Sequence, residues 1–120
     1  MENNELIFDS RNPLFSKADI LARRIYQITR DFPKSEIFSL TSQIRRSGLS
    51  VILNIIEGFA RNNPKEFKRF LFIAFGSLKE TKYLLFFATE QQYISKQTYQ
   101  ELINLSSEIA KIIWTIVHKK

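Results

Sequence analysis

The sequence predicts an all-α protein that folds as an antiparallel, up-down-up-down four-helix bundle and assembles as a homo-oligomer. Apolar residues recur at helical spacing in four separate segments, and no segment shows the alternation typical of a strand. Only three glycines and three prolines occur in 120 residues, which suits long helices joined by short connections. In addition, residues 43–61 are apolar on almost every side, so one small bundle would leave part of this helix uncovered.

The first helix is expected at about residues 14–31. Pro33 ends it, because the residue before a proline avoids the helical conformation, and Ser16 with Asp19 could cap its start. Its apolar face consists of Ala18, Leu21, Ile25, Ile28 and Phe32.

The second helix ends near Arg61, but its start is open, because Ser35, Ser39 and Thr41 could each cap it. It has two apolar sides. One side consists of Ile44, Val51 and Ile55, and the other of Leu49, Ile52, Ile56 and Phe59. The residues of the second side would be fully buried only by contact with a surface outside one bundle, such as another copy of the chain.

The third helix has the clearest start, with Asn63 as the N-cap, Pro64 at the first position and Glu66 at the third. It is expected to continue to about Glu90. Its core stripe consists of Phe67, Phe70, Leu71, Ala74, Leu78 and Leu85. Four aromatic residues lie off this stripe and need a second cover: Phe72, Phe75, Tyr83 and Phe86.

The fourth helix is expected to start at Ser95, where Ile94 and Tyr99 have the spacing of a hydrophobic staple, and to end near His118. Its apolar face consists of Leu102, Leu105, Ile109, Ile112 and Ile116. Residues 13–120 are therefore expected to form one bundle domain, preceded by a flexible N-terminal arm at residues 1–12.

The composition favours a cytoplasmic protein. The chain has no cysteine, its first residues lack the basic-then-apolar order of a signal peptide, and no apolar run reaches the ~20 residues of a membrane span. The net charge of +6 favours a polyanionic partner, although solvated lysines and arginines are the ordinary alternative.

Little in the sequence supports catalysis. The single histidine, His118, is near the C-terminus, no Glu-x-x-His pair occurs, and there is no glycine-rich phosphate loop or nucleophile elbow. We therefore expect no enzymatic activity, no metal site and no cofactor.

A line of polar residues runs along the second helix, and two polar residues of the third helix are candidate partners. The residues are Ser50, Asn54 and Glu57, with Ser77 and Glu80 opposite. Because buried polar groups require partners, we favour a hydrogen-bonded structural seam over a strip that faces a ligand or partner protein.

Six basic residues are candidates for phosphate contacts, four of them at the junction of the second and third helices: Arg45, Arg46, Arg61, Lys65, Lys68 and Arg69. Such contacts neutralise phosphates without reading sequence. Phe59, Phe67 and Phe70 lie beside these charges and could stack on bases, but at helical spacing they are better explained as core.

These residues resemble a known family. Phe32-Pro33-Lys34, residues 40–46, residues 54–61, residues 66–71 and residues 76–80 together look like the four helix bundle protein family, also called the 23S ribosomal RNA intervening-sequence protein. The resemblance covers about residues 14–118. Ile56 and Phe75 are bulkier than is usual at their positions in that family.

The resemblance implies a homopentamer and a bacterial origin. It also implies a relationship to the accessory variability determinant of diversity-generating retroelements, which binds a reverse transcriptase and nucleic acid. Two hypotheses follow. The first is a basic oligomer that associates with nucleic acid, preferably RNA. The second is a scaffold or adaptor for a protein such as a reverse transcriptase or a ribosome-linked enzyme.

Overall fold

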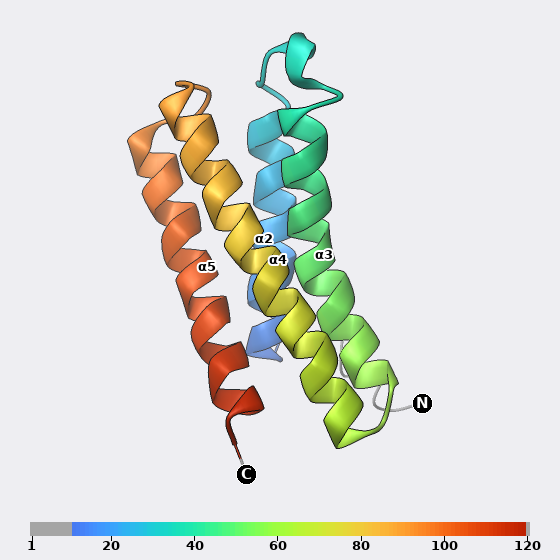
Figure 1. The fold of residues 1–120 in the computed structure, drawn as a ribbon. Helices are drawn as coiled ribbons and strands as arrows, with labels where there is room; N and C mark the ends of the chain where they lie inside the picture. Colours follow the sequence, from blue (N-terminus) through green and yellow to red (C-terminus); the bar gives the residue numbers. More distant parts are fainter. Residues whose placement is uncertain (1–10, 120) are drawn as a thin grey trace.

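The computed structural model describes residues 11–119, which contain four α-helices, one short 3-10 helix and no strand (Figure 1). The elements are α2 (Pro13–Thr29), η1 (Lys34–Glu36), α3 (Leu40–Ala60), α4 (Pro64–Glu90) and α5 (Lys96–Val117). The prediction of an all-α fold with four helices is confirmed. No helix in this part of the chain is both long and apolar enough to cross a membrane.

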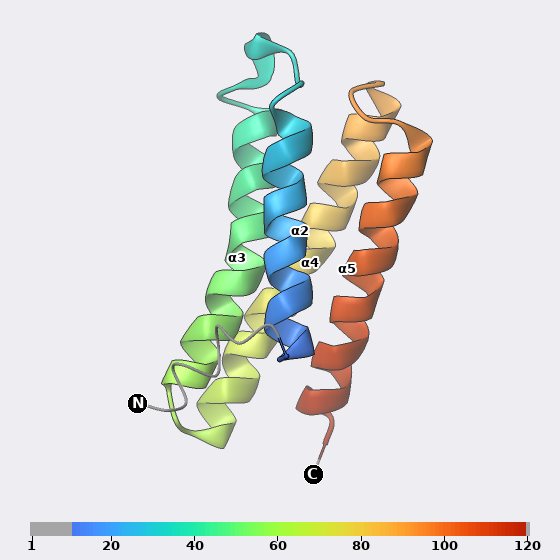
Figure 2. The same ribbon diagram turned by 180° about the vertical axis from the view of Figure 1, so that it is seen from behind.

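The four helices lie side by side, and each runs antiparallel to the next along the chain (Figures 1 and 2). α2 packs against α3 and α5, and α4 packs against the same two helices. The bundle therefore has four outer seams, at α2–α3, α3–α4, α4–α5 and α2–α5. The connection between α3 and α4 lies at one end, and η1 and the connection between α4 and α5 lie at the other.

Three helices begin at a side-chain cap. Asn63 Oδ1 accepts from the backbone N–H groups of Lys65 and Glu66 at 2.9 and 3.0 Å, as predicted. Ser95 Oγ likewise accepts from the N–H of Thr98 at 3.0 Å. These bonds satisfy donors that would otherwise lack a partner in the first turn of a helix.

The predicted cap of the first helix was wrong. Asn12 caps α2, because its Oδ1 accepts from the N–H groups of Leu14 and Phe15 at 3.1 and 3.3 Å, and Pro13 occupies the first helical position. Asp19 instead pairs with Arg23 at 3.0 Å. Asn12 thus belongs to the bundle, and residues 1–10 of the expected arm lie outside the described residues.

The connection from α2 to α3 is longer than expected. α2 ends at Thr29, and the backbone tightens to three-residue spacing, with Phe32 N–H donating to the Thr29 carbonyl at 3.1 Å. The second helix, whose start the sequence left undecided, begins at Leu40. Ser39 precedes it, but its hydroxyl donates to Glu36 Oε1 at 2.6 Å instead of capping α3.

The core matches most of the predicted apolar faces. The residues predicted to face the core in the first helix, on the first side of α3 and in α4 are buried, apart from the half-buried Ile28 and Phe67. On the second side of α3, Ile52 is buried within the chain, and the other three residues are half-buried: Leu49, Ile56 and Phe59. The face predicted for α5 was partly wrong, because Leu105, Ile112 and Ile116 are only half-buried. The inward residues of α5 are Leu102, Ser106, Ile109, Ile113 and Val117. The helix is rotated so that a buried serine lies in its core face.

Candidate nucleic-acid interface

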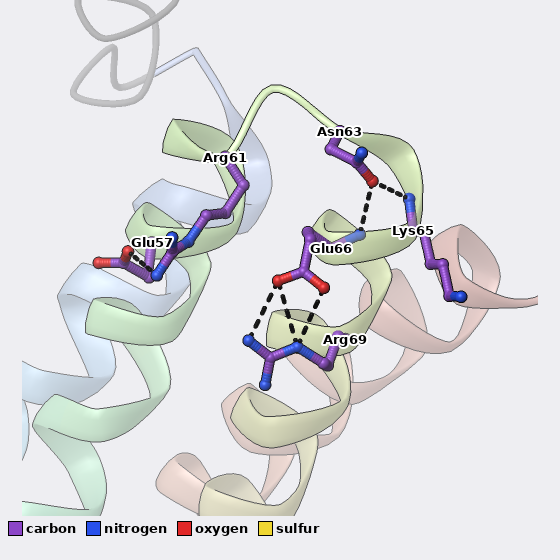
Figure 3. Close-up of polar contacts among 6 residues, drawn as sticks. All are labelled: Glu57, Arg61, Asn63, Lys65, Glu66 and Arg69. Carbon is purple, nitrogen blue, oxygen red and sulfur yellow. Dashed lines mark hydrogen bonds and ion pairs between the residues drawn. The ribbon is translucent and has the colours of Figure 1, made fainter.

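Four of the six candidate phosphate-binding residues gather where α3 passes into α4, and Figure 3 shows three of them. Arg61 follows the last turn of α3, whereas Lys65, Lys68 and Arg69 occupy the first turns of α4. The Asn63 cap sets the direction in which α4 leaves the turn. Local helix geometry thus places these cations at one end of the bundle.

The two arginines of this end are each paired with a carboxylate. Arg61 Nη2 lies 2.9 Å from Glu57 Oε2, and Arg69 Nη2 lies 3.1 Å from Glu66 Oε1 (Figure 3). The hydrogen bonds from Arg69 are the main reason that the pKa of the Glu66 carboxyl is lower than its ordinary value. Both ion pairs are largely exposed to water, so they are weak and screened by salt.

The ring of Phe70 contacts the guanidinium groups of the same two arginines. The guanidinium carbons of Arg61 and Arg69 lie 5.0 and 4.5 Å from the centre of its ring. The ring itself is buried, so it holds the two charged groups over the α3–α4 seam by cation–π contact. Phe70, Phe67 and Phe59 are packed side chains, and Phe59 and Phe67 lie ring to ring at 5.0 Å. Phe70 is buried and Phe59 and Phe67 are half-buried, so packing within the chain occupies much of the ring surface that stacking on bases would need.

The two lysines extend the cationic end. Lys65 is exposed, and Lys68 Nζ donates to the Lys119 carbonyl oxygen at 2.9 Å, which ties α4 to the end of α5. Among residues 11–119, this end thus has four cations, with Arg61 and Arg69, and the carboxylates of Glu57 and Glu66. This end therefore retains an excess of positive charge that can attract phosphates.

Arg45 and Arg46 lie apart from this end. Arg46 is exposed and is separated from Arg61 by roughly 22 Å along α3. Arg45 turns towards α2, where its Nε donates to Thr29 Oγ1 at 2.8 Å and its guanidinium lies 4.5 Å from the Tyr26 ring centre. The structure thus brings together four of the six candidates and places Arg45 in a structural contact.

Three of the five predicted seam residues meet between α3 and α4. Ser50 Oγ and Ser77 Oγ share a hydrogen bond of 2.8 Å, and Asn54 Nδ2 donates to the carbonyl and hydroxyl oxygens of Ser50. Glu57 and Glu80 are exposed and do not join them. Glu57 points to Arg61 instead, one turn further along its own helix.

Thr81, the residue of α4 in the buried part of this seam, was missed by sequence reasoning. Thr81 Oγ1 lies 2.9 Å from Ser47 Oγ and 2.8 Å from the Ser77 carbonyl oxygen, and Thr81 and Ser47 are both buried. Thr81 lies four residues beyond Ser77, which was the available signal. In residues 11–119 every buried side-chain nitrogen and oxygen has a hydrogen-bond partner, so this seam is fully satisfied.

The four-helix fold and the cationic end at the α3–α4 junction together define the class of protein, which is a small basic helical protein. The model of the 23S rRNA-intervening sequence protein family matches residues 11–115, so the chain belongs to that family.

A similar solved structure is that of a protein of unknown function from the S23 ribosomal protein family of Bacteroides thetaiotaomicron. The two chains are 30% identical, with a TM-score of 0.77, and the match covers 87% of this chain and 97% of the other. No curated protein matches the sequence.

Proposed function

We propose that this protein is a non-enzymatic, basic, oligomeric protein of the bacterial cytoplasm that associates with nucleic acid, preferably RNA. The observation that carries the proposal is the cationic end, where Arg61, Lys65, Lys68 and Arg69 outnumber the carboxylates near them in the described part of the chain. The overall charge of +6 and membership of a family described by an rRNA intervening sequence support it. Contacts of this kind bind phosphates with little regard to sequence.

The oligomer, which the family resemblance implies is a pentamer, is supported by apolar surface that the described chain leaves exposed. On the outer sides of α3 and α4, Leu53, Ile73 and Phe87 remain exposed. Gly76 also faces outward on α4, and a Cβ added there would meet nothing within 4 Å. A helical glycine costs about 1 kcal/mol relative to alanine, and close approach of a second copy accounts for its presence.

Titration of a labelled RNA at two salt concentrations tests the association. The affinity is expected to fall steeply with added salt, because phosphate neutralisation releases counterions. The variant Lys65→Gln/Lys68→Gln is expected to bind more weakly and to show a shallower salt dependence. The matched control Lys34→Gln/Lys96→Gln removes two exposed lysines elsewhere. Absence of binding, or equal effects of the two variants, would remove this proposal.

The second candidate function is a scaffold or adaptor for another protein, such as a reverse transcriptase. The observation that favours it is the middle part of the α3–α4 seam, where the uncharged Ser50–Ser77 hydrogen bond has exposed Leu53 and Ile73 nearby on the same two helices. Interface centres are depleted in charge in this way. A partner that stays bound after nuclease treatment would favour the adaptor, and a partner released by nuclease would favour association through RNA.

A further inference from the structure

The outer seam between α4 and α5 combines lysines with aromatic rings, of which Phe72 and Trp114 are exposed and Phe75 is half-buried. We call it the lysine–aromatic seam and define it by its lysines, Lys68, Lys79, Lys82, Lys111 and Lys119, and its rings, Phe72, Phe75 and Trp114. Ring contacts cross it twice, from Phe75 to Trp114 at 6.0 Å between centroids and from Phe72 to His118 at 6.4 Å.

The lysines of this seam have no carboxylate partners among residues 11–119. Lys79 Nζ lies 5.1 Å from the Phe75 ring centre, Lys82 Nζ donates to Ser107 Oγ at 3.3 Å, and Lys68 Nζ donates to a backbone carbonyl. Burial, followed by the charge of Lys79, lowers the pKa of Lys82. An anion from outside would relieve this crowding of like charges.

The seam on the other side of α5 has the opposite character. Lys17 pairs with Glu108 and Arg24 with Glu101, each at 2.7 Å, and both pairs join α2 to α5. The cations of that seam are neutralised within the chain. Among the described residues, therefore, carboxylates pair with the cations on one side of α5 and not with the lysines on the other side.

Two rings of the lysine–aromatic seam, Phe72 and Trp114, are exposed, unlike the packed rings at the α3–α4 junction. Phe72 is 51% exposed and Trp114 is 54% exposed. Phe75 and Trp114 border a surface hollow of about 360 Å³ whose other walls are Ala110, Lys111 and Thr115. The imidazole of His118 already stacks on the indole of Trp114, with ring centroids 3.8 Å apart. Flat rings beside cations are the elements with which proteins bind unpaired bases and their phosphates.

We infer that the lysine–aromatic seam binds single-stranded nucleic acid, with bases stacked on Trp114 and Phe72 and phosphates held by Lys79, Lys82 and Lys111. The inference rests on the proposed association with nucleic acid and locates it on a second surface, continuous with the cationic end through Lys68. Single strands are selected because the faces of their bases are free, whereas a duplex stacks those faces internally.

Trp114 is the only tryptophan of the chain, so its fluorescence reports on this seam alone. The test uses an end-labelled oligoadenylate of about twelve nucleotides, a length within the range of single-strand binding sites. Anisotropy of the label measures binding anywhere on the protein, and tryptophan quenching measures contact at the seam. We expect both signals to change with one midpoint, and we expect a duplex of the same length to bind more weakly.

Substitutions test the contributions of base stacking and of phosphate contacts to the affinity separately. Trp114→Ala is expected to weaken binding roughly 5- to 150-fold, the range for loss of one stacked base, whereas Trp114→Phe retains a ring and most of the affinity. Lys79→Gln/Lys111→Gln is expected to reduce the slope of log affinity against log salt by about 1.4, at about 0.7 per phosphate contact. The control Lys34→Gln/Lys96→Gln is expected to leave that slope unchanged. Circular dichroism establishes that each variant is folded.

Three results would overturn the inference. Anisotropy without quenching, together with unchanged affinity of the seam variants, would place binding elsewhere and leave the proposed function intact. Absence of any anisotropy change would contradict both this inference and the proposed association with nucleic acid. Tryptophan emission that shifts on dilution of the protein alone, with loss of assembly in Trp114→Ala, would make the seam a contact between copies.

Discussion

The hydroxyl of Tyr93 donates a hydrogen bond of 2.8 Å to Glu36 Oε2 and so joins the α4–α5 connection to η1, 57 residues away in the chain. The Tyr93 ring also packs against Phe32 at 5.3 Å between centroids. The hydrogen bonds from Ser39 and then Tyr93 lower the pKa of the Glu36 carboxyl, and the same bond to Glu36 raises the pKa of Tyr93.

These two shifts predict that the Glu36–Tyr93 coupling stabilises the fold only within a window of pH. The lowered pKa of Glu36 contributes stability above its ordinary value of 4.5, and this stability is lost as the pH falls through the folded-state value. The raised pKa of Tyr93 contributes stability below its ordinary value of 10.0, and this stability is lost as the pH rises through the folded-state value.

The measurement is a double-mutant cycle of Glu36→Gln and Tyr93→Phe, followed by urea unfolding at acidic, neutral and alkaline pH. The coupling should be largest near neutral pH and smaller on both sides. A coupling close to zero at every pH would show that the two segments are connected by packing of the ring, which Tyr93→Phe retains, rather than by the hydrogen bond.

The helix starts show which parts of the fold can be predicted from local sequence. Asn63-Pro64 predicts the start of α4 correctly, and the same dipeptide at Asn12-Pro13 starts α2, although the prediction assigned Asn12 to the arm. The signal was present in both places, and the position near the chain end concealed the second. Caps are predictable because their hydrogen bonds span only two or three residues.

Contacts between distant segments could not be predicted in the same way. Helical spacing indicated a polar line on α3 with partners on α4, but it did not fix the rotation that buries Thr81 and leaves Glu80 exposed. The α4–α5 lysines are separated by up to 51 residues, so their common surface depends on how the two helices pack. The candidate cluster at the α3–α4 junction was predictable because a single short turn creates it.

The buried hydroxyl pair of Ser47 and Thr81 provides a test of the seam. Thr81→Val keeps the shape of the side chain but removes the oxygen that lies 2.9 Å from Ser47 Oγ. We expect it to lower the free energy of unfolding by about 1 kcal/mol, the usual net value of one hydrogen bond. Urea denaturation with unchanged slope measures the loss.

The double variant Ser47→Ala/Thr81→Val serves as the control for this pair. Because it removes both partners, no unpaired hydroxyl remains in the core, and it should cost less than the sum of the single variants. Strictly additive losses would mean that the two hydroxyls act independently.

A third prediction concerns the close approach of α2 and α3 at Gly48. A Cβ at this position would lie 2.6 Å from Ile25 Cδ1, and Ile25 is fully buried. Alanine gains about 1 kcal/mol in helix propensity, but overpacking costs about 1–3 kcal/mol. We therefore expect Gly48→Ala to lower the free energy of unfolding by about 1 kcal/mol on balance.

Ile25→Val removes the Cδ1 atom that causes this clash. In that background the nearest remaining atom, Ile25 Cγ1, lies 3.8 Å from the added Cβ, which is ordinary contact. Gly48→Ala should then raise stability by about 1 kcal/mol relative to Ile25→Val alone. Thermal or urea unfolding of the four proteins measures this reversal of sign, and a loss of equal size in both backgrounds would locate the strain elsewhere.

A substitution at Gly76 tests the stability of one subunit and the association of several subunits separately. Because nothing lies within 4 Å of a Cβ at this position, Gly76→Ala should raise the unfolding free energy of the dissociated subunit by about 1 kcal/mol. If copies approach each other closely at Gly76, the added methyl group should weaken their association. Light scattering over a dilution series measures the second effect, and urea unfolding at low protein concentration measures the first. Ser42→Ala, at an exposed position of α3, is the matched control and should leave the assembly unchanged. A stabilised subunit whose assembly is as strong as that of the wild type would show that copies meet on another face.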